Sequence, residues 1–262
     1  MNMIEKAFRT IFTMRWNPGL DLVAVLISWL LVTGTLYTAT IVVTPDTGSG
    51  IPYFLLYAIL GAAVFGIGIP LTWMVIIRKR SLQDLGLTTR FLGASILLQL
   101  VFAALQYSGT LAQTGIPGME KGIPLLALAL AIGFFEAIFW RGWVLLRLEE
   151  AFGLLPAFLL GSLLYAAYHI GYGMQLEEMV FLFFIGLLYA ATFRLTKNVF
   201  LLWPVFQPMG QLVTLLKDGL DLPLISTLGF VEVLVGMLVL IWLAGQYARK
   251  HIPVAAPGEA AI

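Results

Sequence analysis

The chain has 262 residues, of which 60% are hydrophobic and only 11% charged, and its formal net charge is +1. Soluble domains carry about 25% charged residues, so this composition excludes an ordinary soluble protein and indicates one with many membrane spans. The near-neutral charge gives no reason to expect a nucleic acid as partner. The sequence has no cysteine, which excludes disulfides, thiolate nucleophiles and cysteine metal sites.

The chain begins with residues 1–17, in which charged side chains stand among Met, Ile and Phe. This pattern is typical of a short amphipathic helix at the membrane interface. Residues 18–250 are expected to form a single transmembrane helical domain. The Ala- and Pro-rich residues 251–262 are expected to be a disordered cytoplasmic tail.

Since a membrane span needs roughly 20 apolar residues, the sequence predicts about eight transmembrane helices. Gly and Pro separate several of these apolar stretches. The predicted fold class is therefore all-α, a polytopic membrane protein. The expected spans are 22–44, 51–77, 91–114, 123–147, 154–174, 178–196, 198–216 and 224–246.

The basic residues test this number of spans independently. An even number of spans places both termini on one side of the membrane. That side then holds all 15 Lys and Arg residues except Lys121 and Lys217. Because basic residues concentrate in cytoplasmic segments, both termini are expected in the cytoplasm.

Three polar groups interrupt the predicted spans in chain order. Glu136 and Arg141 lie in the fourth span, His169 ends the fifth, and Gln207 and Gln211 lie in the seventh. A charge in hydrocarbon costs at least about 2.5 kcal/mol, so it marks a functional site by default. A carboxylate and an imidazole together are suited to activating water. The two glutamines are four residues apart and face one side of a helix.

These pieces, together with Tyr165 four residues before His169, resemble the motifs of the CPBP family of intramembrane proteases. This family includes the CAAX prenyl-protein endopeptidases and bacteriocin-processing relatives. It has Glu-Glu-x-x-x-Arg, then Phe-x-x-x-His, then His-x-x-x-Asn on successive membrane helices. The resemblance covers roughly residues 78–216, including a stretch at 81–87 similar to the family's segment before the core. It implies a CAAX-protease-like core and a bacterial plasma membrane location.

The resemblance implies a role for each matching residue. Glu136 corresponds to the general base that activates water, His169 to the histidine that holds this water, and Arg141 to a structural arginine. Gln207 and Gln211 stand where the family has the residues that stabilise the oxyanion. The implied enzyme is a glutamic endopeptidase that needs no metal.

The chain departs from the family motifs at four positions. Ala137 replaces the second glutamate one turn before Arg141, so the arginine is expected to lose its helical partner, with Glu149 or a lipid phosphate as a substitute. Tyr165 in place of Phe is a mild change. The glutamines at the last motif remain neutral hydrogen-bond donors, so an oxyanion hole survives chemically.

The leading hypothesis is an intramembrane endopeptidase that hydrolyses a peptide bond of a membrane-associated protein or peptide with a Glu/His-activated water. The alternative is a non-catalytic relative that serves as a subunit or assembly factor of a membrane complex. A transporter is a third class, but the sequence has no inverted repeat. The expected partners are the lipid bilayer, a protein or peptide substrate and other membrane subunits.

No cofactor is expected, and a metal ion is the weakly supported alternative. A zinc site needs three or more protein ligands, and the intramembrane candidates are only Glu136, His169 and Glu232. Glu232 in the eighth span has no counterpart in the family motifs. It is interpreted as a helix-packing residue, with a proton or ion site as the alternative.

Overall fold

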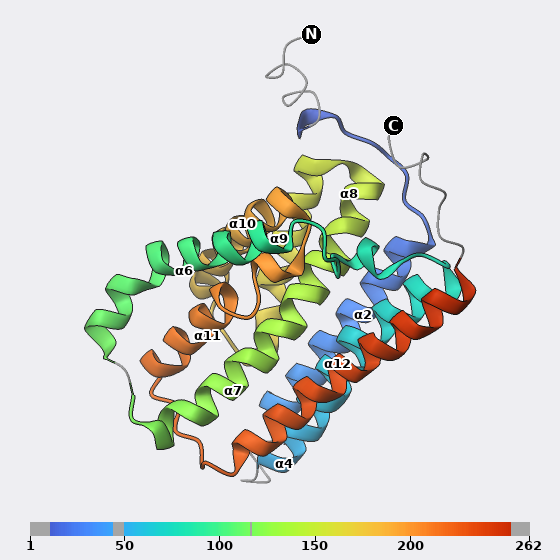
Figure 1. The fold of residues 1–262 in the computed structure, drawn as a ribbon. Helices are drawn as coiled ribbons and strands as arrows, with labels where there is room; N and C mark the ends of the chain where they lie inside the picture. The colour runs from blue at the N-terminus through green and yellow to red at the C-terminus, as the bar shows by residue number, and fades with distance from the viewer. Residues whose placement is uncertain (1–10, 44–49, 116, 253–262) are drawn as a thin grey trace.

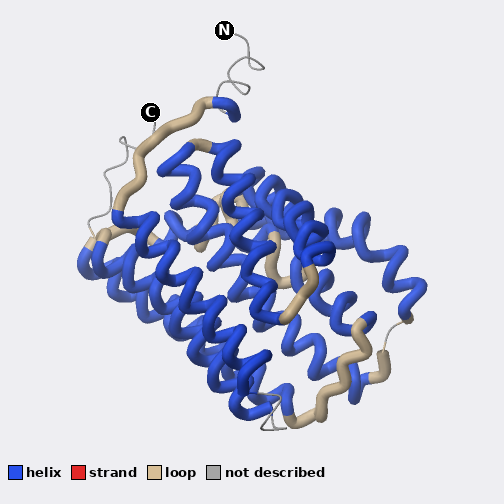
Figure 2. Tube along the Cα trace, turned by 180° about the vertical axis from the view of Figure 1, so that it is seen from behind, coloured by secondary structure: helices blue, strands red, loops and turns tan. Residues whose placement is uncertain are grey.

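The computed structural model describes residues 11–43, 50–115 and 117–252, and this part of the chain consists of helices and loops without strands (Figure 2). The predicted all-α fold is confirmed. Seven helical stretches in the described residues are long and apolar enough to cross a membrane, as expected of a multi-pass membrane protein. They are Leu20–Val43, Gly50–Ile77, Leu92–Gln113, Met119–Phe152, Leu154–Tyr172, Leu176–Thr196 and Ser226–His251.

The first two stretches combine α-helix with π-helix, in which the hydrogen bonds join residues five apart. They pack side by side, and α12 (Ser226–His251) lies against the second, so that the three form one layer of the molecule (Figure 1). Their elements are α2 (Leu20–Tyr37), η1 (Thr38–Val43), α4 (Gly50–Tyr53), η2 (Phe54–Gly68), α5 (Ile69–Leu71) and η3 (Thr72–Ile77).

The centre of the molecule is the fourth stretch, which is 34 residues long. It consists of α7 (Met119–Glu136), π-helical η5 (Ala137–Leu145) and α8 (Leu146–Phe152). Its most apolar window is 67% buried, against 11% for α12, so protein rather than lipid surrounds it. Before it, a loop with the 3₁₀ turn η4 (Leu82–Leu85) leads to α6 (Leu92–Thr114), which runs obliquely to the other helices (Figure 1).

The next two stretches form a helical pair. They are α9 (Leu154–Tyr168), which ends in the 3₁₀ turn η6 (His169–Tyr172), and α10 (Leu176–Thr196). α9 packs against α10 along its length and against α8 at its beginning. The close approach of the pair depends on Gly186, where an added Cβ would lie 3.0 Å from the Ser162 side chain.

The span expected at 198–216 is a broken segment rather than one long helix. It contains the 3₁₀ turn η7 (Val199–Leu201), a turn, and α11 (Phe206–Lys217). The 12 residues of α11 extend about 18 Å, which is less than the roughly 30 Å of a bilayer core. Leu202 is fully buried, and non-helical backbone at membrane depth is tolerated only inside protein.

This broken segment nevertheless crosses the molecule. Arg194 and Lys197 at the end of α10 pair with Glu149 of α8, 3.2 and 3.5 Å apart. Lys79 donates a hydrogen bond to Tyr247 near the end of α12. These contacts place the end of α10 and the end of α12 at the same end of the bundle, so the chain between α10 and the start of α12 runs from one end to the other (Figure 1).

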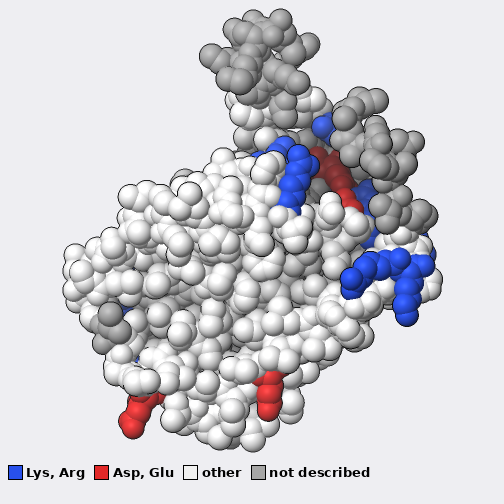
Figure 3. All heavy atoms as spheres, viewed as in Figure 1, with Lys and Arg blue, Asp and Glu red and all other residues white. Residues whose placement is uncertain are grey.

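The charges separate along this axis. On the face shown in Figure 3, most of the Lys and Arg atoms lie along one end of the bundle, from the top of the view to where α12 ends, while the wide middle band is uncharged. Acidic atoms appear at the opposite end in the same view. We call the first of these the basic end; it carries Arg78, Lys79, Arg80, Arg194, Lys197, Arg249 and Lys250.

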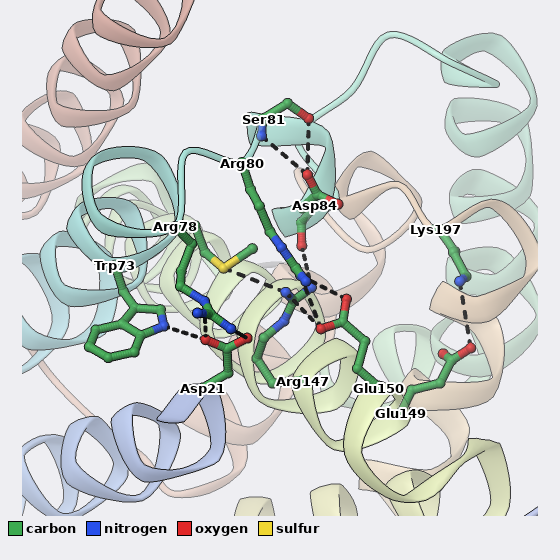
Figure 4. Close-up of polar contacts among 11 residues, drawn as sticks. Asp21, Trp73, Arg78, Arg80, Ser81, Asp84, Arg147, Glu149, Glu150 and Lys197 are labelled. Carbon is green, nitrogen blue, oxygen red and sulfur yellow. Dashed lines mark hydrogen bonds and ion pairs between the residues drawn. The ribbon is translucent and has the colours of Figure 1, made fainter. Parts of the chain in front are cut away.

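A network of ion pairs joins the helices at the basic end (Figure 4). Arg78 pairs with Asp21 at 2.8 Å, and Arg80 pairs with Glu150 at 2.9 Å. Two of the three cations at 78–80 are thus tied to acids of other helices. Exposed pairs of this kind contribute little individually, about 0–1 kcal/mol, but together they fix the helix ends relative to one another.

The loop at 81–87, which resembles the CPBP segment before the core, is held tightly against the central helix. Arg147 donates a hydrogen bond to the Asp84 carbonyl at 3.1 Å. A Cβ on Gly142 would lie 2.1 Å from the Leu85 carbonyl oxygen, so only glycine allows this approach. The Val199 N–H donates to the Gly86 carbonyl at 3.0 Å, so the loop connects η5 with the start of the broken segment.

Much of the two terminal segments lies outside the described residues. Residues 1–10 of the expected interfacial helix at 1–17 lie outside the described residues, and residues 13–19 are not helical. The N–H groups of Arg15 and Asn17 donate instead to carbonyls at the end of α8, at 3.0 and 2.9 Å. Of the expected tail at 251–262, only His251 and Ile252 are described, and α12 ends at His251.

Candidate functional site

The last residue of α7, Glu136, receives hydrogen bonds from both glutamines of α11. The Gln207 side-chain amide donates to Glu136 Oε2 at 2.6 Å, and the Gln211 amide donates to the same oxygen at 3.0 Å. Glu136 and Gln207 are each only 1% exposed. The other carboxylate oxygen, Oε1, accepts no hydrogen bond from any residue in the described part of the chain.

The packing of α7 against α11 makes these contacts possible. Gly133 lies one turn before Glu136, and a Cβ there would come within 2.8 Å of the Pro208 ring. The missing side chain therefore lets α11 approach closely at the level of the carboxylate. The predicted pairing of Gln207 with Gln211 on one face of a helix accounts for their convergence on Glu136.

The start of α11 is held by a third glutamine. Gln99 of α6 is 1% exposed, and its side-chain oxygen accepts a hydrogen bond from the Val205 N–H at 3.0 Å. Val205 directly precedes α11. The contact satisfies a backbone donor in the break and fixes where the short helix begins.

Arg141 is buried without a hydrogen-bonding partner. It is 1% exposed, and none of its three guanidinium nitrogens has a partner among the described residues. The guanidinium carbon lies 5.0 Å from the ring centre of Tyr165 and 5.8 Å from that of Tyr189. Cation–π contacts with these two rings therefore surround the charge.

The sequence pattern missed the register that sets the surroundings of Arg141. Ala137 lies one turn below the arginine in an α-helix, whereas in the π-helical η5 the hydrogen bonds join residues five apart, which is the spacing of Glu136 and Arg141. The suggested substitute, Glu149, pairs with Arg194 and Lys197 rather than with Arg141. A π-helical segment directly after the buried carboxylate thus brings the cation to its side of the helix.

His169 lies in a box of tyrosine rings. The centres of Tyr165 and Tyr168 are each 4.9 Å from the imidazole centre, and that of Tyr172 is 5.7 Å away. His169 Nδ1 is 2.8 Å from the Tyr165 carbonyl oxygen. A carbonyl only accepts, so Nδ1 carries the proton, and the Nε2 of the neutral ring keeps a free lone pair.

Glu136 and His169 therefore have different hydrogen-bond partners. An aromatic wall connects their surroundings: Trp140 of η5 contacts the rings of Tyr165 and Tyr168, with centres 5.5 and 5.2 Å apart. Trp140 itself is only 1% exposed within this wall.

Two groups of tyrosine hydroxyls lie around the site and were not identified from the sequence. Tyr57, Tyr168 and Tyr172 form a triangle of hydrogen bonds, with Tyr172 donating to Tyr57 at 2.8 Å. Tyr107 and Tyr189 form a second pair at 2.9 Å. The pattern of tyrosines at 165, 168 and 172, on one face of a helix around His169, was the available signal.

The second hydroxyl pair lies directly against α11. A Cβ on Gly210 would lie 2.5 Å from the Tyr107 hydroxyl and 2.8 Å from that of Tyr189. These hydroxyls thus contact the helix between the two glutamines that hold Glu136. Among the described residues, no group of three or more His, Cys, Asp or Glu side chains could hold a metal ion.

The comparison with protein families agrees with the motifs. Residues 117–206 match the family model described as Type II CAAX prenyl endopeptidase Rce1-like. Over this stretch the chain is similar to that family. The expected resemblance to the CPBP family is therefore confirmed, and it supports a membrane protein with a CAAX-protease-type core.

The matched stretch contains Glu136, Arg141, Tyr165 and His169, and it ends one residue before Gln207. The two glutamines that hold Glu136 and the loop at 81–87 thus lie outside it. No curated protein and no solved structure matches the chain.

Proposed function

We propose that the protein is an intramembrane endopeptidase that hydrolyses a peptide bond of a membrane-associated protein or peptide, with Glu136 as the general base. The observation that carries the proposal is the arrangement of its carboxylate. Two amides donate to Oε2, and Oε1 receives no hydrogen bond from the described residues. One oxygen is thereby oriented, and the other remains available to take a proton from water.

In the proposed reaction, Glu136 accepts a proton from a water molecule while the water oxygen attacks the substrate carbonyl. The resulting tetrahedral intermediate carries its negative charge on the former carbonyl oxygen. The carbon–nitrogen bond then breaks, and Glu136 returns the proton to the leaving amine. Water is consumed, and one new carboxyl and one new amino terminus form.

Gln207 and Gln211 serve this reaction in two ways. Each side-chain amide has two N–H groups, and only one is needed for the bond to Glu136. The second N–H of each is free to donate to the oxyanion. Such donors are effective because they are already oriented in a water-poor site.

His169 completes the proposed site through Nε2. Its Nδ1–H is committed to the Tyr165 carbonyl, so Nε2 can accept a hydrogen bond from the attacking water. This role requires a neutral imidazole, whose Nε2 carries the lone pair. The proposed mechanism needs no metal or other cofactor.

The test compares protein termini in membranes that contain the wild type, Glu136→Gln or His169→Ala at matched expression. We expect specific new termini in the wild type and none in either variant. Glu177→Gln and His251→Ala are the matched controls, because both residues are exposed and lie outside the site. If the termini found in the wild type persist in Glu136→Gln, the proposal is wrong. Another enzyme then makes those cleavages.

The second candidate is a non-catalytic relative that acts in a membrane complex. It is favoured by the unpartnered Arg141 beside Ala137 and by the two amides that already occupy Glu136 Oε2. This candidate predicts identical termini in all five membranes and an unchanged set of associated proteins in Glu136→Gln. The location we propose for either function is a bacterial plasma membrane.

A further inference from the structure

Glu232 points away from the rest of the chain. It lies in α12 and is exposed, while its neighbour Val233 is 4% exposed and Met237 is fully buried. Val233 and Met237 are four residues apart, so they share the face of α12 that packs against the rest of the chain. No described residue forms a hydrogen bond or ion pair with Glu232. The packing role expected for Glu232 is therefore not fulfilled within this chain.

The position of Glu232 along α12 places it inside the hydrocarbon. The helix has 26 residues and ends with the basic residues Arg249, Lys250 and His251, which lie at the membrane surface. Counting roughly 20 residues back from Arg249, the apolar core reaches about residue 229. Glu232 then lies about 5 Å inside the opposite boundary, at 1.5 Å per residue.

The residues around Glu232 form a continuous outward stripe. Leu228, Glu232, Val235, Val239 and Trp242 follow one another at intervals of four, three, four and three residues. The four apolar members are 59%, 50%, 46% and 60% exposed, respectively. This alternation is the spacing by which one helix packs against another in a left-handed pair.

A carboxylate in lipid is costly, so its presence within a helix-pairing stripe indicates a partner that compensates it. We propose that this stripe of α12 binds a transmembrane helix of a different protein, which carries a Lys or Arg side chain at the depth of Glu232. The apolar members supply packing, and the ion pair sets the depth and the choice of partner. The interaction is independent of the chemistry proposed for Glu136.

A second copy of this chain fits the stripe poorly. Two copies in one membrane have the same orientation, so a two-fold pair of α12 helices would be parallel. The same residue then meets itself near the axis of the pair. Two Glu232 carboxylates would face each other at equal depth and repel.

The test uses the full chain in its native membrane with a photoreactive diazirine residue at Val235. The matched control carries the same residue at Phe184 on α10, which is 61% exposed to lipid. We expect one membrane protein to be cross-linked from Val235 and not from Phe184. The cross-linked peptide of this protein should contain Lys or Arg within an apolar stretch.

Variants of Glu232 then decide whether the charge carries the interaction. Glu232→Leu should lower the cross-link yield at least about fivefold, in the range of an interhelical hydrogen bond. Glu232→Lys should abolish it, and replacing the basic residue of the partner by Glu should restore it in the Glu232→Lys background. Because Glu232 is exposed, thermal midpoints of these variants should match the wild type.

Four outcomes would overturn the proposal. These are cross-links from Val235 to lipid alone, cross-links to a second copy of this chain, equal yields from Phe184, and a yield that Glu232→Leu leaves unchanged. A protein that is cross-linked only because it is abundant would not regain the cross-link when Glu232→Lys is combined with Glu at its own basic residue.

Discussion

At the residue scale, the two glutamines that hold Glu136 differ in strength. The Gln207 bond is 2.6 Å long and fully buried, while Gln211 is half-buried and its bond is 3.0 Å long. A hydrogen bond to a charged group contributes about 1.5–3 kcal/mol, and more where water is excluded. The shorter, buried bond should therefore matter more for the orientation of the carboxylate.

We accordingly expect Gln207→Leu to lower the cleavage rate by about 10- to 100-fold and Gln211→Leu by about tenfold or less. The rate is measured on the substrate that the comparison of termini identifies. Gln106→Leu is the control, because Gln106 is a half-buried glutamine of α6 away from Glu136. Equal losses in the two variants would contradict the unequal roles.

The two buried arginines of the central helix offer a second contrast. Arg141 has no hydrogen-bonding partner in the described chain, whereas Arg147 pairs with Glu150 at 3.1 Å and with the Asp84 carbonyl at 3.1 Å. An unpaired buried charge is costly, and replacing it by an apolar side chain of similar volume is often neutral or stabilising. Removing a paired arginine leaves its partners unsatisfied.

Arg141→Met should therefore raise the thermal midpoint or leave it unchanged, with a gain in unfolding free energy of up to about 2 kcal/mol. Arg147→Met should lower the midpoint. Scanning fluorimetry of the detergent-solubilised protein measures both. A clear fall for Arg141→Met would mean that lipid or water groups satisfy its guanidinium in the membrane.

At the element scale, the site depends on how closely α7 and α11 approach. The contact lies at Gly133, where a methyl group would meet the rigid Pro208 ring at 2.8 Å. A proline ring cannot turn aside, so the helices themselves must separate. The separation would draw both glutamine amides away from Glu136.

We expect Gly133→Ala to lower the unfolding free energy by about 1–3 kcal/mol and the cleavage rate to a similar extent as Gln207→Leu. Gly109→Ala on α6 is the control, since nothing lies within 4 Å of a Cβ at that position. There, alanine should be neutral or slightly stabilising. Unfolding in denaturant and the cleavage assay give the two quantities; a variant that is stable and fully active would show that the approach is not needed.

The parts of the site that could be predicted from the sequence are those that depend on the geometry of a single helix. The spacing of Gln207 and Gln211 predicted their common face, and this local relation survives in the fold because it depends only on helical geometry. The register of Arg141 could not be predicted, since the switch from α7 to η5 at Glu136 leaves no mark in the local pattern. The hydroxyl groups around the site come from distant helices, and their meeting depends on tertiary packing.

The break before α11 marks another limit. Residues 198–216 are apolar on average, and this average is the same for one long helix and for a broken segment. The sequence therefore predicted a span here and missed the interruption between η7 and α11. Charge alternation depends instead on the side of the membrane that each loop reaches. It predicts a crossing between Lys197 and Lys217, where the broken segment runs from one end of the bundle to the other.

At the scale of the whole molecule, the orientation in the membrane follows from the separation of charge between the two ends. The basic end should face the cytoplasm, because positively charged segments are retained there. The natural chain has no cysteine, so single cysteines report this directly and without a background. The most informative position is Asp218, since it follows a crossing that contains only a 12-residue helix.

We expect a membrane-impermeant maleimide to label Glu120→Cys, Glu177→Cys and Asp218→Cys in intact cells, and Gln83→Cys and Lys250→Cys only after the membrane is opened. All five residues are exposed, so differences in labelling report the side of the membrane and not burial. If Asp218→Cys instead behaved like Lys250→Cys, residues 198–217 would enter and leave on the cytoplasmic side. Gln207 and Gln211 would then reach Glu136 from a re-entrant segment. The start of α12, close to Glu232, would then lie at the cytoplasmic surface and not at the outer one.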